Sequence, residues 1–210
     1  MVCLRMSLSA VVAAAALILA VPGVVRAQTT GPSPAPAAPA QPGQPAEAQP
    51  ATTGQPGDPF GEETTLTAKS MVYAKGTATW DSAFETLVEA FKSVYGYLDK
   101  EGLAADGPPM TIYTATDDTG FQYQAGVPIK AEPKSPPHGD LALGKSPDGK
   151  ALKFIHRGSY DAMDTTYDAI TNFLDEKRLE AKDLFIEQYV TDPRTTAEDK
   201  LVVEVYVPIK

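Results

Sequence analysis

One carboxylate near the end of the chain is the leading candidate for chemistry. Glu204 lies in the stretch 201–210, where apolar residues alternate with Val202, Glu204 and Tyr206. This alternation is typical of a strand with two different faces, so Glu204 shares a face with a valine and a tyrosine. A carboxylate among apolar neighbours is poorly hydrated and favours a cation or a proton nearby. The alternative is a solvated glutamate on an open sheet face.

A second carboxylate and several aromatic rings could complete a binding site. Glu187 and Tyr189 are two residues apart on an expected strand, so their side chains point to the same face. Glu187 could pair with Glu204, or it could be a surface residue. Aromatic rings over a cation contribute about 0.5–2 kcal/mol each. The candidate ligand-binding residues are Glu204, Tyr189, Tyr113, Trp80, Tyr160, Tyr206 and Glu187, whereas Tyr167, Phe121 and Tyr123 are expected in the core.

The sequence gives little support for a metal site or a catalytic triad. His138 and His156 are far apart and have no neighbouring metal-ligand pattern, so no metal site is expected. Ser159 lies between His156 and Asp161, but sequence adjacency is not triad geometry, and a helix cap explains this serine better. We therefore predict no catalytic residue and no cofactor.

The candidate residues belong to a duplicated unit. The tetrapeptide Val-Pro-Ile-Lys occurs at 127–130 and again at 207–210. Each copy closes a stretch with the order strand, helix, strand, strand, which predicts one repeat over 66–130 and another over 150–210. The expected strands are 66–75, 110–114, 121–127, 152–157, 185–190 and 201–207, with a short strand at 140–143 in the connection.

Helix signals fit the same organisation. Ser82 and Glu85 have the spacing of a capping box at the start of a helix that Gly102 would stop. Ser159 is the expected cap of the second helix, and Gly76 is the expected end of the first strand. Two such units can share one sheet. The predicted fold is α+β, an antiparallel sheet with two helices on one face and a groove between the repeats.

The first 64 residues are expected to lie outside this domain. Arg5, an apolar centre and a small-residue exit at Ala27 have the pattern of a secretory signal over 1–27, with a retained anchor as the alternative. Residues 28–64 are rich in Pro, Ala and Gln, which is typical of a disordered linker. Removal of 1–27 takes away Arg5, Arg26 and no acid, which moves the formal charge from -9 to -11. Such an acidic chain is a poor partner for nucleic acid.

Four segments carry a resemblance to a known family. They are His-Arg-Gly-Ser-Tyr at 156–160, Tyr167, Glu-Gln-Tyr-Val-Thr-Asp-Pro at 187–193 and Glu-Val-Tyr-Val-Pro-Ile at 204–209. In their order they resemble the GyrI-like small-molecule-binding family, which is also the effector-binding domain of some AraC-type and MerR-type regulators. The resemblance covers 65–210. It implies an aromatic groove that holds cationic, lipophilic compounds beside a glutamate, and it places that glutamate at Glu204.

The combined expectation is an exported small-molecule-binding protein, periplasmic or secreted, for cationic or amphipathic compounds. It has no DNA-binding partner and no membrane span after signal cleavage. We expect binding rather than catalysis. A hydrolase of strained, cyclopropane-bearing electrophiles that uses Glu204 is one alternative, because some family members resemble such hydrolases. A protein-interaction module with a flat apolar face is the other.

Overall fold

A computed structural model describes residues 57–58 and 60–210 of the chain. The predicted signal 1–27 and most of the predicted linker lie outside the described residues. Within them the main elements are β1 (Glu62–Leu66), β2 (Ser70–Thr79), α1 (Ala83–Glu101), β3 (Met110–Thr116), β4 (Gly120–Pro128), β5 (Leu141–Lys145), β6 (Gly149–Gly158), α2 (Met163–Lys177), β7 (Phe185–Tyr189) and β8 (Leu201–Pro208). Short 3₁₀ turns are η1 (Trp80–Ser82), η2 (Tyr160–Ala162) and η3 (Glu198–Lys200).

The described strands form a single antiparallel sheet in the order β1-β6-β8-β7-β3-β4-β2-β5. In the first half β4 lies between β2 and β3, and in the second half β8 lies between β6 and β7. The two halves meet where β3 pairs with β7. This arrangement confirms the predicted α+β fold with its strand, helix, strand, strand order in each half.

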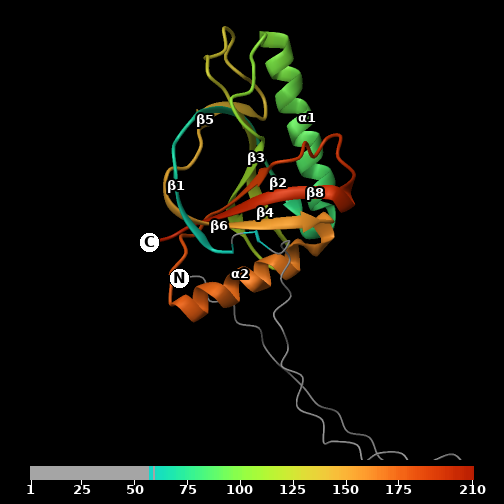
Figure 1. Cartoon of the computed structure of the whole chain (residues 1–210). Coiled ribbons are helices and arrows are strands. Elements are labelled where there is room, and N and C mark those ends of the chain that lie inside the picture. The colour runs from blue at the N-terminus through green and yellow to red at the C-terminus, as the bar shows by residue number, and fades with distance from the viewer. Residues whose placement is uncertain (1–56, 59) are drawn as a thin grey trace, which may run out of the picture. The chain divides into compact units, whose positions relative to one another are not determined.

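The edge strands are exchanged between the halves. β1 precedes β2 in the chain but pairs with β6, and β5 precedes β6 but pairs with β2. Only three residues connect Leu66 to Ser70, and three connect Lys145 to Gly149, so both ends of the sheet are held near one another. Figure 1 shows the strands curving accordingly, with α1 and α2 outside the curve.

The sequence misplaced the first strand and the end of the linker. The strand expected over 66–75 is interrupted, because β1 ends at Leu66 and β2 runs from Ser70 through Gly76 to Thr79. Residues 62–64, assigned to the linker, belong to β1 and pair with β6. Polar β1 residues do not alternate clearly with apolar ones, because an edge strand buries little of either face.

Contacts before β1 also bind the supposed linker to the domain. The Arg157 guanidinium donates to both carboxylate oxygens of Asp58, at 2.7 and 3.1 Å. The Phe60 ring packs edge-on against Phe154 and Phe173, with centroids 4.9 and 5.6 Å apart. These contacts show that the folded domain begins several residues earlier than the sequence indicates.

The helix ends agree with expectation more closely than the starts. Gly102 adopts the left-handed conformation at φ 66°, which confirms it as the stop of α1. Ser82 is not a side-chain cap, and its hydroxyl lies 3.1 Å from the Thr79 hydroxyl instead. Ser159 does act as a cap, but for η2, where it accepts a hydrogen bond from the Asp161 amide at 3.3 Å.

Both sheet faces carry apolar clusters. The larger cluster joins the helices to the sheet and includes Leu87, Phe91 and Ile170 with Val203 and Val205. The smaller cluster lies on the opposite face and contains Met71, Met110, Ile112 and Ile186, with Tyr206 packed against it. No helix among the described residues has the length and apolar character needed to span a membrane.

Candidate functional site

Glu187 is a charged side chain in the middle of the large apolar cluster. It lies on β7, is only 1% exposed, and is paired in register with Thr111 of β3 and Val205 of β8. Val205 packs in the cluster beneath the helices, so Glu187 faces the same layer. Burial of a carboxylate at this depth is costly unless it is hydrogen-bonded.

Four tyrosine hydroxyls surround this carboxylate. Tyr113 and Tyr189 donate to its Oε2 at 2.8 Å each, and Tyr167 donates to Oε1 at 2.7 Å. Tyr160 lies 3.3 Å from Oε2 and 2.7 Å from the Tyr113 oxygen. Because the single Tyr113 proton points to Glu187, the Tyr160 hydroxyl donates mainly to the Tyr113 oxygen and makes a longer, weaker hydrogen bond with the carboxylate. We call these five residues the tyrosine cage.

The cage has an unusual charge balance. Burial raises the pKa of Glu187 above its ordinary value, while the four phenol donors, which favour the ionised form, act in the opposite direction. Burial also raises the pKa of each phenol, and the nearby Glu187 carboxylate raises it further, so all four stay protonated donors. Within the described part of the chain, the recorded partners of Glu187 are all hydroxyl groups, and none is a cation.

The cage lies where the two halves of the sheet meet, at the pairing of β3 with β7. Four residue pairs join β3 to β7, from Met110 with Gln188 to Tyr113 with Phe185, and Thr111 with Glu187 is one of the two inner pairs. A two-fold axis through this pair exchanges Thr111 with Glu187, and Tyr113 with Tyr189. The position that holds the carboxylate in the second half of the sheet therefore corresponds to one that holds a threonine hydroxyl in the first half.

The two helices can be compared in the same way as the two strands. α1 and α2 end at Gly102 and Arg178, both left-handed, which sets an offset of 76 residues. At this offset Phe84 corresponds to Tyr160, and Phe91 corresponds to Tyr167. The first repeat thus supplies phenylalanines where the second supplies phenols. One half of the site is apolar and the other carries hydroxyls and the charge.

Phe84 and Tyr160 cover the cage where α1 and α2 begin. Their ring centroids are 5.2 Å apart at an interplanar angle of 31°, and both side chains are half-buried. Tyr160 also makes the longest of the four contacts with Glu187. Of the four phenols, Tyr160 therefore has the weakest contact with the carboxylate itself, although its hydroxyl lies 2.7 Å from that of Tyr113.

Comparison with known proteins places the chain in a family. The model of the GyrI-like small molecule binding domain matches residues 62–210, which is most of the chain and all of the sheet. The protein belongs to the GyrI-like family. Among curated proteins, no sequence matches this one.

Solved structures share the fold of this GyrI-like domain at low identity. The EcmrR C-terminal domain has a TM-score of 0.60 and 13% identity, covering 71% of this chain and 96% of that one. In a DNA complex of EcmrR, the match spans only 56% of the EcmrR chain, with a TM-score of 0.61. A hydrolase from Listeria innocua has a TM-score of 0.51 and 15% identity, over 72% and 92% of the chains. SAV2435 bound to tetraphenylphosphonium has a TM-score of 0.50 and 15% identity, over 71% and 93%.

The residue first singled out in this GyrI-like domain, Glu204, lies away from the cage. Gln188 and Tyr206 donate to its Oε2 at 3.1 and 2.7 Å, and the Lys153 ammonium lies 4.0 Å from Oε1. Gln188, not Glu187, is its register partner on β7. Glu204 and Glu187 therefore occupy opposite sheet faces and do not pair, and Glu187 is not a surface residue either, because it is buried.

The other predicted aromatic residues divide between the two faces. Tyr113, Tyr160 and Tyr189 meet at Glu187, whereas Tyr206 lies beside Glu204. Trp80 is 44% exposed and reaches the cage only through Phe121, at a centroid distance of 4.8 Å.

Tyr167 was assigned to the core, yet it is the donor to Glu187 Oε1. The repeat comparison could have revealed it, because this tyrosine replaces the phenylalanine of the first repeat.

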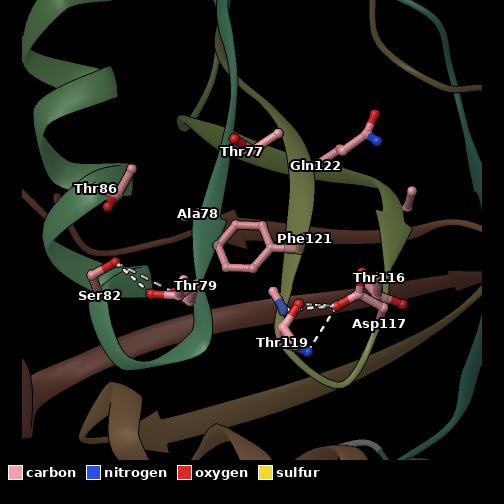
Figure 2. Close-up of a pocket in the computed structure, with 12 residues that line it drawn as sticks. Thr77, Ala78, Thr79, Ser82, Thr86, Thr116, Asp117, Thr119, Phe121 and Gln122 are labelled. Carbon is pink, nitrogen blue, oxygen red and sulfur yellow. Dashed lines mark hydrogen bonds between the residues drawn. The ribbon is translucent and has the colours of Figure 1, made fainter.

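A polar hollow adjoins the cage but has a different character. It encloses about 490 Å³ between the start of α1 and the β3–β4 turn, and Figure 2 shows the Phe121 ring in its middle. That ring lies between the hollow and Tyr113, at a centroid distance of 5.1 Å from Tyr113. The Asp117 Oδ1 already accepts three hydrogen bonds from Thr119 and Gly120, at 2.6 to 3.0 Å. Its carboxylate is therefore satisfied locally. No group of three or more metal-ligating side chains occurs among residues 57–58 and 60–210.

Because Oε1 and Oε2 of Glu187 accept hydrogen bonds from different numbers of phenols, the loss of single hydroxyls should affect the stability of the protein unequally. Tyr167→Phe removes the one recorded donor to Oε1, and we expect it to lower the free energy of unfolding at pH 7 by about 1.5–3 kcal/mol. Tyr160→Phe should cost less than about 1 kcal/mol, because two shorter donors remain on Oε2. Urea unfolding of the two variants measures the difference. Equal losses would show that the hydroxyl contacts do not set the stability of this carboxylate.

Proposed function

We propose that the protein binds lipophilic organic cations at the tyrosine cage, with Glu187 as the countercharge. The observation that carries this proposal is a buried carboxylate whose recorded partners in the described chain are neutral hydroxyls. An ion removed from water without a counterion retains a penalty of several kcal/mol. A bound cation would offset that penalty, so the free site favours ligands of positive charge.

Aromatic residues around Glu187 suit the apolar part of such a ligand. Separation of Phe84 from Tyr160 would expose both ring faces beside the carboxylate, and each face attracts a cation through its quadrupole. Phe91 packs edge-on against Tyr189 at 5.3 Å and would form the apolar wall behind them. Because Tyr160 holds Glu187 least tightly, its movement costs the carboxylate least.

Glu187 takes the role that the sequence assigned to Glu204. The Glu204 carboxylate is 21% exposed, and Lys153 already provides a positive charge at 4.0 Å. A partly hydrated and partly compensated carboxylate offers less to a cationic ligand than a buried, uncompensated one. An exported location, expected from residues 1–27, would present the cage to compounds outside the cytoplasm.

Two probes of nearly equal shape and opposite charge test the proposal. Tetraphenylphosphonium, the ligand of the structural neighbour SAV2435, should bind with one-to-one stoichiometry in titration calorimetry. Tetraphenylborate has the same four phenyl groups but a negative charge, and it should show no binding at the same concentrations. Equal affinity for both would mean that apolar burial alone governs binding. Absence of binding by the phosphonium would reject the proposed ligand class.

A further inference from the structure

The buried hydroxyl of Thr111 lacks a hydrogen-bond partner. Thr111 is fully buried, and among the described residues its Oγ1 is the single buried side-chain polar atom for which no partner is recorded. An unsatisfied buried polar group costs about 1–3 kcal/mol, and valine has almost the same shape without this cost. The hydroxyl therefore weakens the free protein at a position where an apolar residue would fit.

This hydroxyl lies beside the proposed cation site. Thr111 is the register partner of Glu187, and side chains in such pairs have Cβ atoms about 5 Å apart on the same face. Burial raises the pKa of the Tyr189 phenol, and the Thr111 hydroxyl lies close enough to that phenol to lower its pKa somewhat as a weak donor, although the two groups do not reach the geometry of a regular hydrogen bond. A group bound to Glu187 thus comes within reach of Thr111.

The two carboxylate oxygens of Glu187 accept different numbers of hydrogen bonds. Glu187 Oε2 has three phenols around it, whereas Oε1 accepts only from Tyr167. A carboxylate oxygen has about two lone-pair positions, so Oε1 retains capacity for another donor. The Thr111 oxygen has lone pairs as well. The neighbouring strands therefore offer two acceptors, one charged and one neutral, to the same ligand.

We propose that Thr111 is a ligand-contacting residue that selects cations bearing N–H donors, such as amidinium ions, over fully substituted onium ions. The inference rests on the proposed function of the cage. A planar amidinium presents two N–H groups in a fork, one for Glu187 and one for Thr111. A phosphonium with four phenyl groups has no such donor and gains only the charge and the apolar contacts.

Two probes and two variants test this selection. Calorimetry with 4-phenylbenzamidinium and tetraphenylphosphonium compares the wild-type protein with Thr111→Val and Thr111→Ser. We expect Thr111→Val to weaken amidinium binding about tenfold, the effect of one hydrogen bond to a charged group, and to change phosphonium binding less than about twofold. Thr111→Ser keeps the hydroxyl and should retain most of the amidinium affinity. Urea unfolding should show Thr111→Val to be as stable as the wild type or more so.

The outcomes separate the inference from the proposed function. If Thr111→Val weakens both probes equally, or neither, Thr111 does not select N–H donors, although the cage still binds cations. If Thr111→Ser weakens amidinium binding as much as Thr111→Val although it keeps the hydroxyl, the hydroxyl is not the selecting group, and the inference also fails. If tetraphenylphosphonium does not bind the wild-type protein, the proposed function fails first and the inference with it.

Discussion

Replacement of Glu187 by glutamine is expected to weaken tetraphenylphosphonium binding by about a hundredfold. At a separation of about 5 Å and an effective dielectric constant of about 20, one pair of unit charges contributes about 3 kcal/mol. Glutamine keeps the size of the side chain and one acceptor oxygen but removes the charge. Titration calorimetry on the wild type and Glu187→Gln measures this contribution directly.

The matched control for this experiment is Glu204→Gln. Glu204 lies on the opposite sheet face, where Gln188, Tyr206 and Lys153 already contact it. Its substitution should change phosphonium affinity by less than about threefold, because it is remote from the cage and partly screened by water. If Glu204→Gln abolished binding and Glu187→Gln did not, the carboxylate first indicated by the sequence would be the functional one. Unfolding midpoints should be measured for both variants, so that a folding defect is not taken for lost binding.

Phosphonium binding should also depend on pH in a direction set by Glu187. Burial raises the pKa of this carboxyl above the ordinary value of 4.5, despite the opposing phenol donors. The phosphonium charge does not titrate, so only the protein changes. As pH falls through the raised pKa, Glu187 is protonated and affinity should decrease about tenfold per pH unit. The decrease should begin at a higher pH than for an exposed glutamate, and Glu187→Gln should remove it. Binding that stays constant down to pH 4.5 would contradict the proposed countercharge.

The titration of Glu187 should also make the stability of the free protein depend on pH. Glu187 binds its proton more tightly in the folded state than in the unfolded state, because its folded pKa is raised. Its contribution is therefore fully present below pH 4.5 and is lost as pH rises through the folded pKa. Urea unfolding at several pH values measures this loss, and the Glu187→Gln variant should lack it.

The sequence predicted the repeated organisation because the signals for it are local. Helical periodicity and the glycine at 102 define α1, and the repeated Val-Pro-Ile-Lys marks the end of each half. The exchange of β1 and β5 between the halves could not be predicted in this way. Strand pairing is a non-local property, and an edge strand with one shallow face leaves little periodic signal.

The aromatic residues and the presence of a buried carboxylate could also be anticipated, but the choice of carboxylate could not. Alternation along β8 shows that Glu204 and Tyr206 share a face, and alternation along β7 shows the same for Glu187 and Tyr189. Neither pattern tells which residues of β7 share a sheet face with which residues of β8. The register decides it, because Gln188 and not Glu187 lies opposite Glu204.

Sequence alone therefore determined the α+β class, the strand, helix, strand, strand order of each half and the family. The tertiary structure determined that Glu187 faces the helices, that four phenols from both repeats converge on it, and that Thr111 lies across from it. The physical reason is that a side chain acquires its burial and its charge balance from partners far away in the chain. Those partners are brought together only when the sheet has formed and the helices have packed on it.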